Sequence, residues 1–253
     1  MNDMSTPTDL PVWDLDDLYK GTSDPAIEAD LTWLETEAGR FRETWAGRIA
    51  TLSGDQFAEA IEVQEAMSDR TGRLMAFAYL NYATDMSDGE RTRFFQGIQE
   101  RINGLTAQTL FFSIEVNLID DAALEGLFSA SERLAHYRPW LRDLRTMRDH
   151  MLSDELERML HERSITARNA WTRLFDDTIA RMRFTIDGRE MPSQDALNLL
   201  SDRDRAKRTE AAEELARVFG KHIDTFALIM NTLIRDKQIE DDWRRIEKPE
   251  NGR

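Results

Sequence analysis

The four histidines are the side chains of this sequence best suited to bind a metal ion or to move a proton. They are His136, His150, His161 and His222. In a His-Glu-x-x-His helix, two histidines four residues apart face the same side, so that both reach one zinc ion while the glutamate activates its water. Glu162 follows His161, but the residue four positions after His161 is Ile165. Since no two histidines have the required spacing, the sequence predicts no zinc site of this kind.

Other catalytic constellations are also missing from the sequence. It contains no cysteine, which excludes thiolate nucleophiles, disulfides and thiolate metal sites. It has neither a glycine-rich phosphate loop nor a Gly-x-Ser-x-Gly motif. Adjacent carboxylates project about 100° apart on a helix, which argues against shared-proton pairs. The adjacent acids are Asp16-Asp17, Asp120-Asp121, Asp176-Asp177 and Asp241-Asp242. We therefore expect no catalytic, cofactor-binding or metal-binding residue in this chain.

Composition and charge restrict the class of protein and its partners. Of the 253 residues, 41% are hydrophobic and 32% are charged, which supplies enough apolar material for a core. The formal net charge of −15 repels phosphate backbones and anionic lipids, so we expect neither nucleic acid nor a membrane as partner. No segment reaches the roughly 20 apolar residues that span a bilayer, and the first residues do not resemble a signal peptide. A cytoplasmic location is the expectation.

Apolar residues recur every three, four or seven positions along most of the chain, which is typical of amphipathic helices. Residues 10–19 are irregular, and their apolar side chains are expected to hold this arm against the body. Asp24-Pro25 predicts a helix start, and the pairs Ser53–Gln56 and Ser87–Glu90 predict capping boxes at the start of two long helices. Long helices joined by short turns favour antiparallel packing, with their apolar faces as the core.

Shorter helices are expected in the middle of the chain. Asp120 or Asp121 can cap one helix, Pro139 can begin or kink the next, and Ser153 can cap a third. A further helix is expected over residues 165–182. We expect each of these helices to be shorter than the long helices that precede them.

The last third is expected to end in a long helix. Ser193 opens a short helix, and Ser201 with Asp204 is a variant of the capping box that predicts the start of the long one. The expected apolar face of that helix consists of Ala212, Leu215, Phe219, Ile223, Phe226, Met230 and Leu233.

One segment departs from the helical pattern. Residues 182–191 alternate in polarity around Asp187-Gly188, which is a strong signal for a two-residue hairpin turn. The predicted fold is therefore all-α, with long antiparallel helices and one small β-hairpin. We expect three regions: an N-terminal helical region over 1–115, a helical domain over 116–192 that ends in the hairpin, and a third region over 193–253.

Several segments, in order along the chain, together resemble one protein family. They are Pro11–Tyr19, His136-Tyr137-Arg138, Ala170–Asp176 with Arg183-Phe184, Ala196–Arg205, Phe226–Leu233 and Asp236-Lys237. On these segments the chain resembles the N-terminal part of the oligoendopeptidase F family of zinc metallopeptidases, which belongs to the thimet-oligopeptidase-like clan. The segments reach from near the start of the chain to near its end.

The resemblance implies a function that this chain does not carry alone. Family members hydrolyse short peptides in the cytoplasm with one zinc ion, held by a His-Glu-x-x-His helix and a further glutamate in a C-terminal lobe. The N-terminal helices cover that lobe and wall the substrate channel. On this reading residues 193–253 begin the catalytic region and stop before the zinc motif. The expected partners are the missing C-terminal lobe and, in the complete enzyme, short peptides.

Two other interpretations remain open. The chain could be a catalytically silent helical module that binds peptides or a protein partner through an uncovered surface. It could also be a non-functional truncation product, because the polar segment Lys248–Arg253 has the character of a connector. In either case, and in the peptidase interpretation, the chain alone is expected to be inactive.

Overall fold

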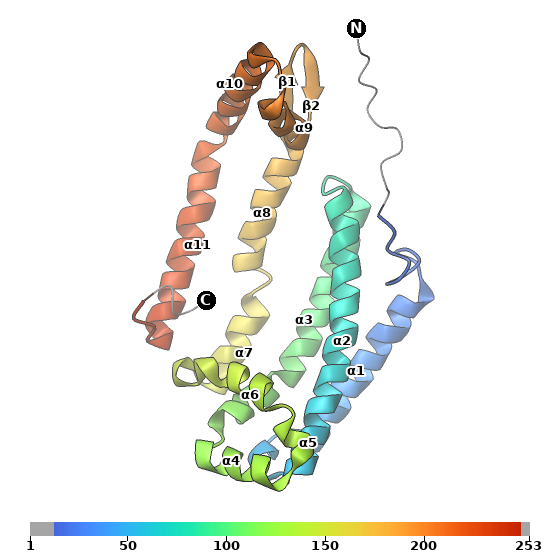
Figure 1. Ribbon diagram of the computed structural model, residues 1–253, viewed down its shortest axis with the longest axis vertical. Helices are drawn as coiled ribbons and strands as arrows, with labels where there is room; N and C mark the ends of the chain where they lie inside the picture. The colour runs from blue at the N-terminus through green and yellow to red at the C-terminus, as the bar shows by residue number, and fades with distance from the viewer. Residues whose placement is uncertain (1–12, 249–253) are drawn as a thin grey trace.

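Three long helices form the larger part of the molecule. The computed structural model describes residues 13–248. Within it α1 (Pro25–Trp45), α2 (Gly54–Thr84) and α3 (Gly89–Leu118) lie side by side, and the short 3-10 turn η1 (Ile49–Thr51) leads into α2 (Figure 1). Their apolar faces meet in one buried cluster that includes Leu31, Phe41, Phe57, Leu74 and Phe112. The predicted all-α fold with long antiparallel helices is confirmed.

Two of the three predicted helix starts in this bundle are confirmed and one is wrong. The Asp24 carboxylate accepts a hydrogen bond from the Ala26 amide, and Ser53 with Gln56 forms a complete capping box. The third helix begins one residue later than expected, since Asp88 rather than Ser87 caps it through the amides of Glu90 and Arg91. A carboxylate interacts more favourably than a hydroxyl with the positive end of a helix.

The N-terminal arm is held against the bundle by buried and polar contacts. Leu15 and Leu18 pack on the core, and Tyr19 is 1% exposed. The Tyr19 hydroxyl donates to Asp30 Oδ2 at 2.7 Å, and Arg73 donates to the Leu18 carbonyl. The predicted docking of this arm is therefore confirmed for residues 15–19 but not for Trp13, whose side chain is 72% exposed. Residues 10–12 lie outside the described part, as does Pro249–Arg253 of the expected connector.

Short helices close one end of the bundle. They are α4 (Asp121–Ala130), α5 (Glu132–Ala135), α6 (Arg138–Leu144) and the 3-10 segment η2 (Arg145–His150). Asp120 caps α4, and Pro139 lies in the first turn of α6, as predicted. The N-terminus of α2 approaches this base closely, because a Cβ at Gly54 would lie 2.5 Å from the Ser131 Cβ. Ser131 fixes the contact by donating to Asp55 Oδ1 at 2.5 Å.

Two helices lead from the base toward the second half of the molecule. These are α7 (Asp154–Arg163), which packs on α3, and α8 (Arg168–Arg181). Ser153 occupies the position before α7, but its side chain makes no capping hydrogen bond. The helix expected over residues 165–182 begins three residues later, at Arg168, since a turn over residues 164–167 separates it from α7.

A smaller buried cluster forms around the predicted hairpin. Strands β1 (Phe184–Ile186) and β2 (Arg189–Met191) are antiparallel, with Phe184 opposite Met191. Asp187 and Gly188 both have positive φ, at 52° and 68°, as a tight turn of this type requires. Phe184 and Ile186 point into a core shared with α10. The predicted hairpin is confirmed.

The last predicted helix consists of two helices. After α9 (Ser193–Asn198) and the 3-10 turn η3 (Leu199–Ser201), α10 (Arg205–Lys221) begins at the cap Asp204, not at Ser201. The chain then breaks at His222, and α11 (Ile223–Arg244) follows. The prediction of a single long helix was therefore wrong. It arose because the apolar residues keep their helical spacing across the one-residue interruption at His222. In Figure 1, α11 lies alongside α8.

Side-chain carboxylates of α10 satisfy the outer edge of the hairpin. Glu214 Oε1 accepts from the Thr185 amide at 2.9 Å, and Glu210 Oε1 accepts from the Asp187 amide at 2.8 Å. The Thr185 amide belongs to β1, and the Asp187 amide belongs to the turn that follows it. Since an unpaired strand edge is prone to pair with other chains, the two glutamates both attach the hairpin to α10 and protect its edge.

Candidate functional site

The structure keeps the four histidines apart. His136 is exposed beside Tyr137, and His222 is half-buried at the break between α10 and α11. His150 lies in η2 with Nδ1 2.8 Å from the Arg244 carbonyl, and His161 lies in α7. Within residues 13–248 no three His, Asp or Glu side chains group as metal ligands. The described residues therefore do not fit the family's zinc ion, and no catalytic step can be assigned to it in this part.

A buried ion pair fixes the end of α11 to the base. Arg244 donates to both carboxylate oxygens of Glu157 in α7, at 2.6 and 2.9 Å, and their side chains are only 15% and 12% exposed. Burial alone would raise the pKa of Glu157, but hydrogen bonds from Arg244 and the Leu152 amide hold that pKa below its usual range. This Arg244–Glu157 ion pair, named the Arg244 clamp, has a structural role, because it joins two helices and both of its charged groups are occupied by each other.

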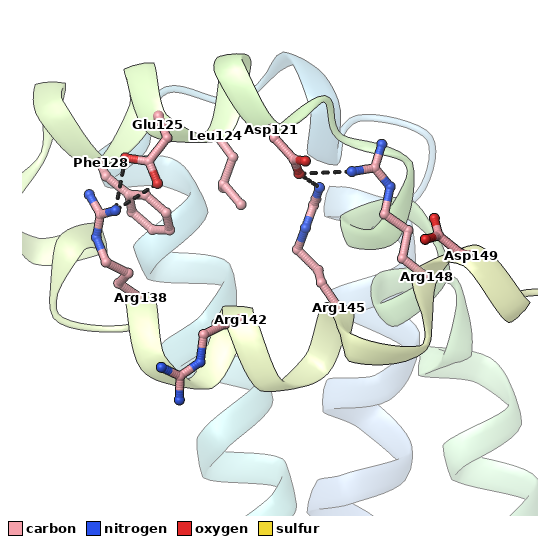
Figure 2. Close-up of a pocket in the computed structure, with 9 residues that line it drawn as sticks. All are labelled: Asp121, Leu124, Glu125, Phe128, Arg138, Arg142, Arg145, Arg148 and Asp149. Carbon is pink, nitrogen blue, oxygen red and sulfur yellow. Dashed lines mark hydrogen bonds and ion pairs between the residues drawn. The ribbon is translucent and has the colours of Figure 1, made fainter. Parts of the chain in front are cut away.

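A pocket of about 460 Å³ opens at the base between α4 and the α6–η2 segment. Figure 2 shows one wall made of α4 and the other made of the segment from Arg138 to Asp149. Its lining consists of Asp121, Leu124, Glu125, Phe128, Arg138, Arg142, Arg145, Arg148 and Asp149. Four of the nine lining residues are arginines. Their spacing of three or four residues places them on one side of the segment.

Three of these arginines bridge the two walls. Arg138 donates to both carboxylate oxygens of Glu125, and Arg145 and Arg148 both donate to Asp121 Oδ1, at 2.5 and 2.8 Å (Figure 2). The Arg145 side chain is 8% exposed. It also donates to two carbonyls in the last turn of α3, those of Val116 and Ile119. Arg145 therefore holds α3, α4 and η2 together.

Helix α11 carries a large amount of exposed apolar surface. Its large exposed hydrophobic side chains, each between 46% and 63% exposed, are Ile223, Leu228, Met230, Ile234, Ile239 and Trp243. Single exposed apolar residues are common on protein surfaces, but several on one helix indicate a surface that binds another element. Leu174 and Phe175 of α8 are also more than 40% exposed. This surface, made by the exposed apolar residues of α11 and α8, is called the α8–α11 surface below.

The exposed residues of α11 lie on two sides of the helix. At about 100° per residue, Ile223, Met230 and Ile234 share one side, whereas Leu228, Ile239 and Trp243 share a nearly opposite side. The face between them packs on α8, where the rings of Phe226 and Phe175 are 5.5 Å apart. A helix that is apolar on most of its circumference is typical of the interior of a larger assembly.

Comparison with known proteins finds similarity to one family. The family model described as oligopeptidase F matches residues 115–184. Oligopeptidase PepF of Bacillus subtilis (strain 168) is 23% identical over 234 residues, which cover 88% of this chain and 34% of that protein. The crystal structure of oligoendopeptidase-F from Enterococcus faecium superposes with a TM-score of 0.80 at 20% identity, over 91% of this chain and 46% of that one. The chain matches the N-terminal part of an oligoendopeptidase F.

A second solved structure shares the fold of this oligoendopeptidase F-like chain more loosely. The crystal structure of a putative peptidase from Chlamydophila abortus gives a TM-score of 0.55 at 17% identity, over 94% of this chain and 40% of that one. The chain spans about a third of the length of the curated relative and less than half of each solved structure. In the part that the structure describes, no helix has the length and apolar character needed to cross a membrane.

Sequence reasoning missed both the arginine pocket and the α8–α11 surface. The spacing of Arg138, Arg142, Arg145 and Arg148 was visible in the sequence, but their partners Asp121 and Glu125 lie on another helix. The apolar residues of α11 were expected in the core because periodicity shows that a face is apolar but does not show what covers it.

Proposed function

We propose that this chain is the N-terminal helical part of an oligoendopeptidase F-like zinc metalloendopeptidase that acts on short peptides. In that enzyme it walls the substrate channel, and the α8–α11 surface packs against the catalytic lobe that holds the zinc. The uncovered apolar sides of α11 carry the proposal, together with the match to the family. The division into regions 1–115, 116–192 and 193–253 is part of this proposal, with the last region as the start of the catalytic part.

The position of the apolar residues supports a protein partner in preference to a small ligand. Met230 and Ile234 on one side of α11, and Leu228 and Trp243 on the other, are each exposed by more than half. Both sides follow the length of the helix and do not converge on an enclosed cavity. Burial of such residues contributes about 1.5–3 kcal/mol for each large side chain. A partner that encloses α11 therefore gains a large favourable free energy.

The chain alone is proposed to be inactive. Hydrolysis by this family requires a zinc ion and a general base beside it, and the described residues group no ligands for one. The purified chain incubated with zinc and an internally quenched peptide is expected to give no turnover. Turnover that a chelator abolishes would contradict this part of the proposal.

Reconstitution tests the proposed role directly. The chain is mixed at micromolar concentration with a separately expressed C-terminal part of a homologous oligopeptidase, starting after the equivalent of α11. Zinc-dependent cleavage of the quenched peptide is expected only in the mixture. If both parts are folded and no complex forms by sedimentation, the proposal is wrong.

A pair of surface variants shows whether α11 mediates the association. Met230→Asp with Ile234→Asp places two charges on an exposed apolar side, so the isolated chain should fold normally while the complex is lost. Asn231→Asp is the control, because Asn231 is also exposed but lies on the polar face of α11, opposite the face that packs on α8. Equal association of the double variant and the control would exclude α11 as the interface.

An interaction module without peptidase function is the second candidate. The same α8–α11 surface favours it, because an uncovered apolar helix face can bind an amphipathic peptide. Calorimetric titration of the chain with short apolar and basic peptides distinguishes the two. Saturable peptide binding that Met230→Asp abolishes, together with no reconstitution of peptidase activity, supports the interaction module. Flat calorimetric traces across a diverse peptide set contradict it.

A further inference from the structure

The carboxylate of Asp176 on α8 carries a charge that no described residue compensates. The residue is partly buried, and this burial raises the pKa of the carboxyl, because neither a hydrogen bond nor a cation among the described residues acts in the opposite direction. Its neighbour Asp177, in contrast, pairs with Arg181 at 2.8 Å. Since a carboxylate that is partly removed from water is normally paired with a cation, Asp176 is a group that a cationic ligand would satisfy.

Two tyrosines near the end of α2 supply a hydroxyl group and an accessible ring. Tyr82 is 6% exposed, and its ring stacks on Phe95 with the ring centres 5.1 Å apart, so its position is fixed. Its hydroxyl makes no hydrogen bond to a described residue and is not sealed from solvent. Tyr79, one turn earlier, is 49% exposed and meets Phe95 edge-on at 6.0 Å. An accessible aromatic ring of this kind attracts cations.

Helix α8 faces the end of α2 with the side that carries Asp176. In Figure 1, α8 lies between α11 and the paired helices α2 and α3, at the level of the last turns of α2. Burial raises the pKa of Tyr82, the charges of Asp176 and Asp177 raise it further, and the charge of Arg173 lowers it. Positions 173, 176 and 177 share one side of a helix, so this side is the one turned toward Tyr82. Asp176 and the Tyr82 hydroxyl therefore lie near each other, although no hydrogen bond joins them.

We propose that Asp176, Tyr82 and Tyr79 bind the ammonium group of a short peptide. A primary ammonium group has three donors that point in different directions, so it can donate both to a carboxylate on α8 and to a hydroxyl oxygen on α2. A divalent metal ion needs several oxygen ligands, and no group of three acidic or histidine ligands occurs among residues 13–248. The net charge of −15 also favours a cationic ligand. That the ligand is a peptide rests on the proposed function, whereas the recognition of an ammonium group rests on these side chains.

Titration of the full chain with three peptide probes tests the proposal. The probes are leucyl-leucinamide, which has a free amino-terminus, its N-acetylated form, which has no charge, and N-acetyl-lysyl-leucinamide, whose only ammonium group is on the side chain. Calorimetry gives the affinities, and amide NMR shifts give the location. We expect an amine probe to bind at least about tenfold more tightly than the uncharged one, with the largest shifts at residues 79–82 and 173–177. The tighter of the two amine probes identifies the source of the ammonium group.

Three outcomes of these titrations would overturn the proposal. They are equal binding of the charged and uncharged probes, shifts confined to other parts of the chain, and no binding of either amine probe. The measurements use the isolated chain without a catalytic lobe. Failed peptide binding would therefore leave a successful reconstitution standing, and failed reconstitution would leave the ammonium site standing, so that the two proposals are tested separately.

Two adjacent variants distinguish this site from general attraction to an acidic chain. Asp176→Asn removes the charge and keeps the shape, so it should weaken binding of the tighter amine probe by at least about tenfold. The thermal unfolding midpoint should not fall, because the carboxylate has no partner to lose. Asp177→Asn is the matched control: it makes the same charge change one position along α8, at a carboxylate that Arg181 already occupies, and should weaken binding by less than about twofold. Equal losses in the two variants would contradict the proposal.

Tyr82→Phe tests the contribution of α2. It removes the hydroxyl and keeps the ring that stacks on Phe95, so the unfolding midpoint should not fall, while binding of the amine probe should weaken by at least about threefold. An unchanged affinity would exclude the Tyr82 hydroxyl as an acceptor and would overturn a site shared between α8 and α2.

Discussion

Arg244 and Glu157 are 87 positions apart in the sequence, yet their side chains form a two-pronged ion pair at 2.6 and 2.9 Å. The pair joins the end of α11 to α7, and the Arg244 carbonyl adds a contact to His150 Nδ1. Both partners are mostly buried, so each charge depends on the other for compensation.

Removing one member of this pair should be strongly destabilising. Arg244→Met leaves the Glu157 carboxylate buried without its partner, and we expect the free energy of unfolding to fall by about 3 kcal/mol. Denaturant titrations followed by circular dichroism measure the change. The double variant Arg244→Met/Glu157→Gln should recover part of the loss, because it leaves no unpaired charge. Additive effects of the two single variants would show that the pair is not coupled.

A close approach at Gly54 gives a second prediction. Gly54→Ala places a Cβ 2.5 Å from the Ser131 Cβ and 3.0 Å from the Leu127 carbonyl oxygen, so α2 must shift away from the base. Overpacking of this kind costs about 1–3 kcal/mol. Gly72→Ala, in the same helix but with no atom within 4 Å, should instead stabilise by about 0.5–1 kcal/mol. Thermal unfolding that shifts in the same direction for both variants would contradict the assigned contact.

The start of α3 gives a test between two adjacent side chains. Asp88→Ala removes the acceptor for the amides of Glu90 and Arg91 and should cost about 1 kcal/mol. Ser87→Ala removes only a hydroxyl that donates to Asp85 and should change stability by less than about 0.5 kcal/mol. Chemical denaturation of the two variants side by side measures the difference. A larger loss of stability for Ser87→Ala than for Asp88→Ala would show that Ser87 caps the helix, as the sequence predicted.

Acid should loosen the attachment of the hairpin to α10. Hydrogen bonds from Arg217 and from the Thr185 amide lower the pKa of Glu214 from 4.5 to about 2. Because the folded-state pKa is the lower one, the stabilisation is complete above pH 4.5 and is lost as the pH falls toward 2. The protection of the Thr185 amide from exchange, taken relative to its intrinsic rate at each pH, should fall over that range. In Glu214→Gln, this pH dependence should be absent; an unchanged profile would mean that another group titrates.

The sequence predicted elements whose signals are local. Asp187-Gly188 identified the hairpin because both positions need positive φ, and Ser53–Gln56 identified the start of α2 because both capping bonds form within one turn. The break at His222 was not predicted, since Phe219, Ile223 and Phe226 keep helical spacing across it. Periodicity reports the apolar face of a segment, and a one-residue interruption barely alters it.

The candidate sites depend on contacts between distant segments, which the sequence does not display. The arginine spacing from residue 138 to 148 marks one side of a helix, but pairing with Asp121 and Glu125 requires α4 to lie opposite. Likewise, Met230 and Leu215 look alike in the sequence, although Leu215 is buried and Met230 is 60% exposed. The difference comes from which elements surround α10 and α11, and this is settled by tertiary packing.

The Arg244 clamp also restricts how the second half of the molecule can move. Helix α11 is joined to α8 at one end through α10 and the hairpin, while at its other end the clamp ties it to α7, which leads directly into α8. The segments thus close a ring, so sliding of α11 along α8 would strain both ends at once. A swing of α8 and α11 together about the turn at residues 164–167 therefore requires the Arg244–Glu157 pair to open, because Glu157 lies on α7, before that turn.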